Sequence, residues 1–133
     1  MVSRLLPMRP HRARIVLVED NDAVRQSLTI LLRTRGYAVE QYRHGIELLN
    51  NRVLPEADCL LIDYKMPLIN GIELLDRLRK NGFTIPALLI TGVVSTTLTA
   101  RALSCGFVQV IEKPDLDASL IEHIERLVES AGK

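Results

Sequence analysis

Residues 59–63 read Cys-Leu-Leu-Ile-Asp, an unbroken apolar run that ends on an acid. A run this short and this apolar is typical of a strand with both faces buried, as in a parallel sheet. Comparable runs recur along the chain and alternate with segments of helical spacing. The strands are expected at residues 14–18, 37–42, 59–62, 86–90 and 107–111.

Amphipathic segments fill the intervals between these runs. Asp22 is a suitable N-cap for the first helix, and Gly36 is expected to end it. A short helix is expected over residues 45–51, and a weak one over residues 95–104, because this segment holds three threonines. The other two helices are expected around two apolar sets: Ile72, Leu75 and Leu78, and Leu120, Ile121, Ile124 and Val128. Five strands alternating with five helices predict a doubly wound α/β fold, with a parallel sheet covered on both faces.

Size, composition and charge narrow the class of protein. The chain has 133 residues, 47% of them apolar, and a formal net charge of +1. This size suits one domain, and the small net charge gives no reason to expect nucleic-acid binding. The apolar runs are far shorter than a membrane span, and the first residues lack the apolar core of a signal peptide, so a cytoplasmic protein is expected. Cys59 and Cys105 lack the paired spacing of metal sites and are expected to be reduced thiols in or near the core.

The first residues differ in charge from the rest of the chain. Four arginines and no acid precede Ile15, whereas the remainder carries 13 basic and 16 acidic residues. Residues 1–13 are therefore predicted to form a basic, solvated extension, and residues 14–133 the folded domain. If the chain is complete, no helix-turn-helix or other output domain is expected after it.

Polar side chains follow the ends of four predicted strands. Glu19 and Asp20 follow the first strand, Asp63 the third, Thr91 the fourth and Lys113 the fifth. Doubly wound folds bind ligands beyond the carboxyl ends of their strands, so these side chains are expected to converge there. Three neighbouring carboxylates repel one another unless a cation compensates them. Mg²⁺, which prefers oxygen ligands, is the cation expected.

Thr91 and Lys113 complement this acidic cluster. A hydroxyl donor and an ammonium group can hold the oxygens of a phosphoryl group. A carboxylate such as Asp63 is also a competent nucleophile and forms an acyl phosphate when phosphorylated. The set therefore indicates phosphoryl chemistry assisted by a divalent ion.

These residues resemble the receiver domains of two-component response regulators. The resemblance rests on Glu19-Asp20, on residues 63–71 (Asp-Tyr-Lys-Met-Pro-Leu-Ile-Asn-Gly), on Thr91-Gly92 and on Lys113-Pro114. It covers residues 14–130, and the pattern D-x-x-M-P-x-x-x-G is its most specific part. Residues 91–114 are most similar to receivers of the nitrogen-fixation and nitrate-response type. The resemblance implies a flavodoxin-like sheet with strand order 2-1-3-4-5.

The resemblance also implies a role for each position. Asp63 would accept phosphate from the phosphohistidine of a sensor histidine kinase or a phosphotransfer protein. Asp20, Asp63 and the backbone carbonyl of Lys65 would bind Mg²⁺, with Glu19 assisting through water. Thr91 and Lys113 would hold the phosphoryl oxygens, and the bond between Lys113 and Pro114 would be cis. The chain would then be a switch that assists its own phosphorylation and dephosphorylation, not an enzyme acting on external substrates.

The downstream protein partner is not identified by the sequence, and a phosphorylation-dependent dimer stays open. In the family, partners commonly bind the face formed by the fourth helix, fifth strand and fifth helix, here near residues 97–103 and 117–126.

Three positions depart from the common pattern of the family. Val110 replaces an aromatic residue that relays the switch, Lys65 is charged where many members are apolar, and Asp115 replaces a frequent Phe. These departures affect the signal output and the lifetime of the phosphorylated state more than the phosphorylation chemistry.

Two other functions compete with this interpretation. Haloacid-dehalogenase phosphatases also combine an aspartate nucleophile with Mg²⁺, but they require an acid two residues later, where this chain has Lys65. An interaction module that has lost phosphotransfer is the other alternative. The retention of Glu19, Asp20, Asp63, Thr91 and Lys113 favours the phosphoacceptor.

Overall fold

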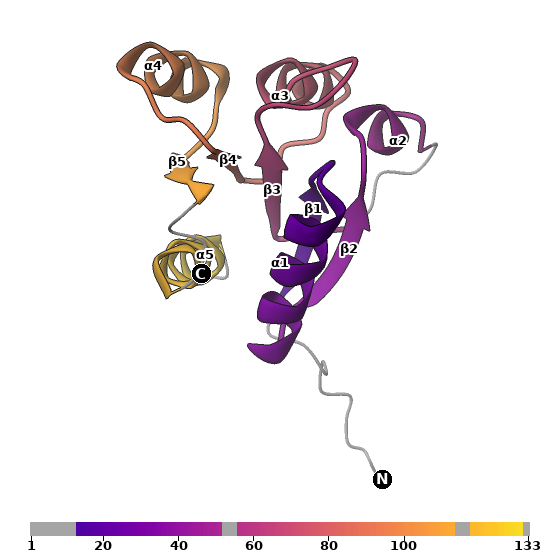
Figure 1. The fold of residues 1–133 in the computed structure, drawn as a ribbon, viewed down its shortest axis with the longest axis vertical. Helices are drawn as coiled ribbons and strands as arrows, with labels where there is room; N and C mark the ends of the chain where they lie inside the picture. The colour runs from indigo at the N-terminus through magenta and orange to yellow at the C-terminus, as the bar shows by residue number, and fades with distance from the viewer. Residues whose placement is uncertain (1–12, 52–55, 114–117, 132–133) are drawn as a thin grey trace, which may run out of the picture.

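The computed structural model describes residues 13–51, 56–113 and 118–131, which form one parallel sheet between two layers of helices (Figure 1). The strand order is β2-β1-β3-β4-β5, so the predicted fold class and topology are confirmed. The strands are β1 (Arg14–Val18), β2 (Ala38–Tyr42), β3 (Cys59–Asp63), β4 (Ala87–Thr91) and β5 (Gln109–Glu112). Each lies within two residues of its predicted position.

Five helices cover the sheet within the described residues. They are α1 (Asp22–Thr34), α2 (Gly45–Leu49), α3 (Gly71–Lys80), α4 (Thr96–Cys105) and α5 (Ala118–Ala131). Figure 1 shows α2, α3 and α4 on one face of the sheet and α1 and α5 on the other. No helix of this described part has the length and apolarity needed to span a bilayer.

The central strand β3 is buried along its whole length, and its side chains alternate between two cores. Leu60 and Ile62 pack in the core beneath α2, α3 and α4. Cys59 and Leu61 pack in the core beneath α1 and α5. Each fully buried leucine contributes about 1.5–3 kcal/mol to folding, so the two cores fix the register of β3 and the position of Asp63 at its end.

Both cysteines are free, as predicted, with Cys59 buried and Cys105 half-buried. One local prediction was wrong. The N-cap of α1 is Asn21, whose side chain accepts a hydrogen bond from the Val24 amide, and Asp22 is the first helical residue. On α3, Leu75 and Leu78 are buried and Ile72 packs half-buried against the same core, to which Leu74 also belongs.

Several sequence predictions lie outside the described residues. They concern residues 1–12 of the predicted extension 1–13, the geometry of the bond to Pro114, and the side chains of Asp115 and Asp117. Ala13, the last residue of that predicted extension, is buried in the core beneath α1 and α5.

Candidate functional site

Three carboxylates meet at the carboxyl edge of the sheet. Glu19 and Asp20 follow β1, and Asp63 ends the neighbouring strand β3, in which Ile62 is paired with Val18. One oxygen from each of the three residues lies within 4.8 Å of the others. Glu19 and Asp63 are almost completely buried, whereas Asp20 is partly exposed. Adjacent parallel strands thus place the acids as the sequence pattern predicted.

Lys113, the first residue after β5, reaches between the two buried acids. Its Nζ lies 3.2 Å from Oδ1 of Asp63 and 3.3 Å from Oε1 of Glu19. The Lys113 side chain is 26% exposed, so its charge is both close to the acids and accessible from solvent. In this structure Lys113 neutralises part of the charge of Glu19 and Asp63. An incoming anion would have to share the ammonium group with these two carboxylates.

The surroundings perturb the protonation of this group of side chains. Burial, and after it the charge of the Glu19 carboxylate, raise the pKa of Asp63 to about 8, although Lys113 opposes both effects. Burial alone would lower the pKa of Lys113, but the Asp63 and Glu19 carboxylates outweigh burial and raise it. Without additional positive charge, keeping Asp63 ionised in this site therefore costs free energy.

An oxygen without a partner marks where such a charge would bind. Lys113 reaches Oδ1 of Asp63 and Oε1 of Glu19, but no described residue donates to Oδ2 of Asp63. Buried oxygens are normally hydrogen-bonded, so a single lysine shared by two buried acids, with one oxygen left unsatisfied, indicates a missing cation or donor. Hard oxygen ligands at this spacing match the donor set of Mg²⁺, so the residues present suit the ion.

Thr91 lies at the end of β4 but does not contact the acids in this structure. Its Oγ1 donates a hydrogen bond to the Val93 carbonyl at 3.1 Å and accepts one from the Val93 amide at 3.3 Å. The hydroxyl therefore stabilises the turn at the start of the loop between β4 and α4. To bind a phosphoryl oxygen, Thr91 would have to release Val93.

The loop between β3 and α3 is built to approach the acceptor closely. Met66 and Ile69 are buried and anchor the loop in the core. The Gly71 amide donates to the Tyr64 carbonyl at 2.8 Å, and a Cβ at Gly71 would lie 2.6 Å from the Asp63 carbonyl oxygen. These contacts explain physically why a methionine and a glycine stand at these positions of the D-x-x-M-P-x-x-x-G pattern. Lys65 is exposed, and no donor of the described residues binds its carbonyl.

Arg25 organises the loop between β1 and α1, and the sequence interpretation missed it. Its guanidinium donates to the Glu19 carbonyl at 3.0 Å, pairs with Asp22 at 2.7 Å and bonds Gln41 at 3.2 Å. The side chain is only 7% exposed. The available signal was a charged residue at helical spacing from Leu28 and Leu32, on the buried face of α1.

Comparison with known proteins places this site in a family. The family model described as Response regulator receiver domain matches residues 15–125. The transcriptional regulatory protein FixJ of Azorhizobium caulinodans is 34% identical over 112 residues, which are 84% of this chain and 53% of that protein. FixJ of Rhizobium meliloti is 34% identical over 113 residues, which are 85% of this chain and 55% of that protein. The chain spans about half the length of these curated relatives.

Solved structures indicate the same family. Full-length FixJ from B. japonicum superposes with a TM-score of 0.83 at 31% identity, covering 91% of this chain and 60% of that one. The structure titled FixJ-N superposes with a TM-score of 0.79 at 32% identity, covering 92% of this chain and 96% of that one. The chain belongs to the response regulator receiver domain family.

Proposed function

We propose that this chain is a phosphoacceptor in a two-component phosphorelay, with Asp63 taking phosphate from a phosphohistidine. The observation that carries this proposal is the state of Asp63. Its carboxylate is buried, its Oδ1 lies 3.2 Å from Lys113, and its Oδ2 has no partner among the described residues. A buried carboxylate held beside a cation is oriented for attack on phosphorus, and the conformational response would carry the signal.

Asp20, Asp63 and the Lys65 carbonyl are proposed to hold Mg²⁺, with Glu19 assisting through water. When bound, the ion would neutralise charge on the phosphoryl oxygens. Lys113 is proposed to bind one of these oxygens and Thr91 another. The phosphoryl group would thus draw the Thr91 hydroxyl from Val93, which couples phosphorylation to the loop between β4 and α4.

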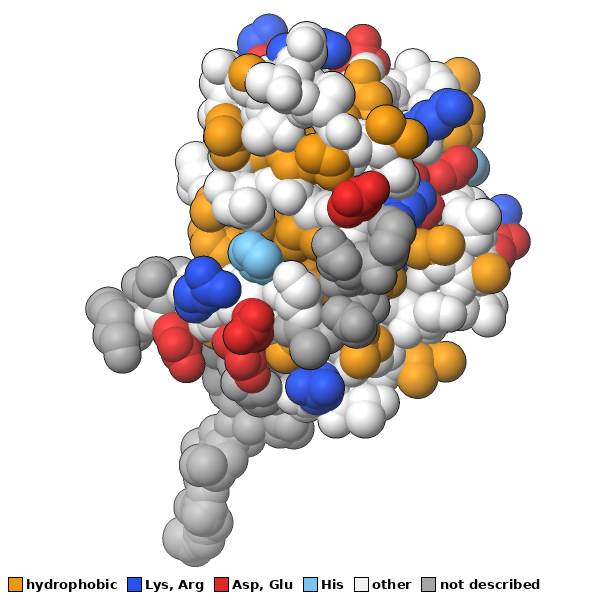
Figure 2. Space-filling model, turned by 60° about the vertical axis from the view of Figure 1, so that its left-hand side comes forward, with side chains coloured by type: hydrophobic (Ala, Val, Ile, Leu, Met, Phe, Trp, Pro, Cys, Tyr) orange, Lys and Arg blue, Asp and Glu red, His pale blue; other side chains and the backbone are white. Residues whose placement is uncertain are grey.

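The proposed surface for a protein partner is the face formed by α4, β5 and α5. Figure 2 shows hydrophobic side chains spread over this face. Leu103 on α4 is 49% exposed, and Val108, just before β5, is 48% exposed. A downstream protein or a second phosphorylated copy of the chain would bury these side chains.

Two competing functions predict different behaviour. A phosphatase needs a general acid near the nucleophile, and the exposed Lys65 occupies the position where that acid is required. An interaction module without phosphotransfer has no use for two buried carboxylates that share a single lysine, an arrangement that costs free energy. Both observations favour the phosphoacceptor.

Labelling with a small phosphodonor tests the proposal. We expect one phosphoryl group per chain, dependent on Mg²⁺, and its loss in Asp20→Ala with the fold preserved. Glu122→Ala, which removes an exposed acid from α5, is the matched control and should label normally. Continuous release of phosphate with many turnovers would identify a phosphatase, and absence of any label would identify an interaction module. Full labelling of Asp20→Ala in the absence of Mg²⁺ would contradict the metal assignment.

A further inference from the structure

A pocket of about 420 Å³ opens between the loops that follow β3 and β4 and the first turns of α4. Its wall includes Lys65 from the first loop, Thr91 and Val93 from the second, and Arg101 from α4. It therefore begins beside the acceptor, because Lys65 lies two residues after Asp63 and Thr91 follows Ile90, the residue of β4 paired with Asp63. None of the residues that line it, all within the described ranges, is acidic.

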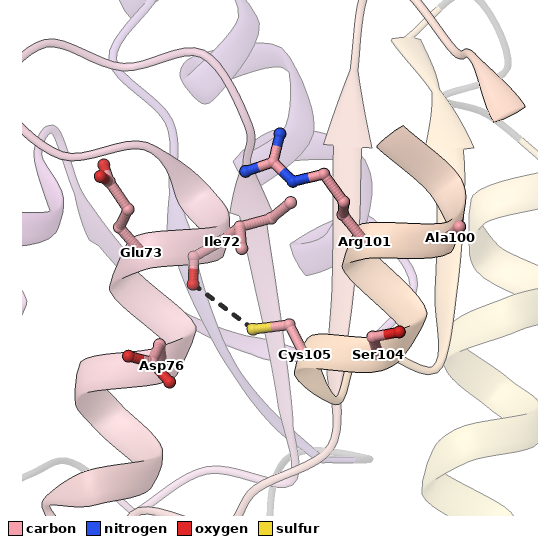
Figure 3. Close-up of a pocket in the computed structure, with 7 residues that line it drawn as sticks. All are labelled: Ile72, Glu73, Asp76, Ala100, Arg101, Ser104 and Cys105. Carbon is pink, nitrogen blue, oxygen red and sulfur yellow. Dashed lines mark hydrogen bonds between the residues drawn. The ribbon is translucent and has the colours of Figure 1, made fainter. Parts of the chain in front are cut away.

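Arg101 has no carboxylate partner in the described part of the chain, although two acids stand on the facing helix. Glu73 accepts a hydrogen bond from the Asn70 amide at 2.9 Å, and Asp76 pairs with Lys80 at 3.0 Å. Arg101 also lines the neighbouring cavity between α3 and α4, together with Glu73 and Asp76. Figure 3 draws that cavity and shows the Arg101 guanidinium extending from α4 toward α3 and pointing away from Asp76. The arginine thus offers an exposed charge to the pocket.

In-line phosphoryl transfer fixes the direction in which a leaving group departs. Attacking and leaving atoms lie roughly in line through phosphorus, so the leaving group of a donor at Asp63 points outward from the carboxylate. When the donor is an acyl phosphate, an oxygen of Asp63 forms the new bond to phosphorus, and the bond from phosphorus to the acyl oxygen breaks. The carboxylate of the donor leaves with the electron pair of that bond and carries a full negative charge.

We propose that Arg101 is a specificity-determining residue that binds the carboxylate leaving group of acyl-phosphate donors. This inference rests on the proposed phosphoacceptor function of Asp63. The Arg101 guanidinium stabilises charge that develops on the acyl oxygen, and Lys65 adds positive potential across the pocket. Donors whose leaving group departs neutral gain nothing from Arg101.

Two donors separate this role from a general effect on the site. Acetyl phosphate releases acetate, an anion. Phosphoramidate carries a protonated nitrogen and releases neutral ammonia when its bond from phosphorus to nitrogen breaks. We expect Arg101→Gln to lower the second-order labelling rate with acetyl phosphate about fivefold, the effect of one unit charge a few ångströms away in a solvated site. The rate with phosphoramidate should stay within about twofold, and Arg101→Lys should restore most of the acetyl phosphate rate.

Arg77→Gln provides the matched control, because it removes an exposed arginine from α3 outside the pocket. It should leave both rates unchanged, which excludes an effect of net charge. Equal losses with both donors in Arg101→Gln, or no loss with either, would overturn the assignment of Arg101. Wild-type protein that labels with neither donor would instead refute the phosphoacceptor function itself.

Discussion

Gly71 sits where the first turn of α3 meets the end of β3, and Gly71→Ala perturbs the site by geometry alone. The added Cβ would lie 2.6 Å from the Asp63 carbonyl oxygen and 2.9 Å from Cδ1 of Leu89. Carbon-to-oxygen contacts of this kind normally start near about 3.3 Å, so the atoms must separate by roughly 0.7 Å. Leu89 can rotate, but the Asp63 carbonyl belongs to the backbone of the central strand.

The expected cost is that of inserting a methyl group into a packed region, about 1–3 kcal/mol of unfolding free energy. Alanine's better helix propensity, at most about 1 kcal/mol, offsets little of this because Gly71 begins the helix. Urea unfolding of the metal-free protein measures the loss. The labelling rate of Asp63 should fall as well, since its backbone must move.

Gly92→Ala is the matched control for stability. A Cβ at Gly92 would meet no atom within 4 Å, and this glycine does not have a positive φ. It should unfold within about 0.5 kcal/mol of wild type, as surface substitutions usually do. If Gly71→Ala also stays within about 0.5 kcal/mol, the close approach of α3 to β3 does not hold and the reasoning is refuted.

Three further predictions concern charge, lifetime and motion. The pKa of Asp63 in the folded protein, about 8, exceeds its usual value of 3.8, so ionised Asp63 destabilises the metal-free fold increasingly as pH rises from about 4 toward 8. Asp63→Asn should therefore raise the unfolding free energy by about 1–3 kcal/mol at pH 8 and hardly at all at pH 4.5, and equal gains at both pH values would contradict the raised pKa. The exposed Lys65 is expected to shield the acyl phosphate from water, so Lys65→Ala should shorten the phosphorylated half-life, and an unchanged decay rate counts against this. Amide exchange with and without a phosphate mimic should change most at residues 91–95 and in α4, and strongest changes in Gln109–Glu112 around Val110 would show that the switch works differently.

Much of this fold follows from local patterns in the sequence. The apolar run at residues 59–62 predicted a strand buried on both faces, and the structure buries all five residues of β3. Because parallel strands end at one edge, the order of Glu19, Asp20 and Asp63 along the chain was enough to predict their convergence. Neither step required knowledge of side-chain partners.

Contacts between distant elements could not be predicted in this way. The sequence predicted that Lys113 would reach the same edge, but its ion pairs with Glu19 and Asp63 depend on how the end of β5 meets the ends of β1 and β3. Arg25 is buried because Gln41 and the Glu19 carbonyl satisfy its guanidinium, and no local pattern reveals those partners. The same holds for Thr91, whose bond to Val93 is a property of the loop conformation.

The central claim is that Asp63 is the single phosphoacceptor of this chain. Intact-mass measurement of wild type and Asp63→Asn, each with acetyl phosphate in Mg²⁺ or in chelator, tests it most directly. The account predicts one added phosphoryl group in wild type with Mg²⁺ and none in the other three samples. A phosphoryl group on Asp63→Asn, or labelling of wild type that is unaffected by the chelator, would contradict it.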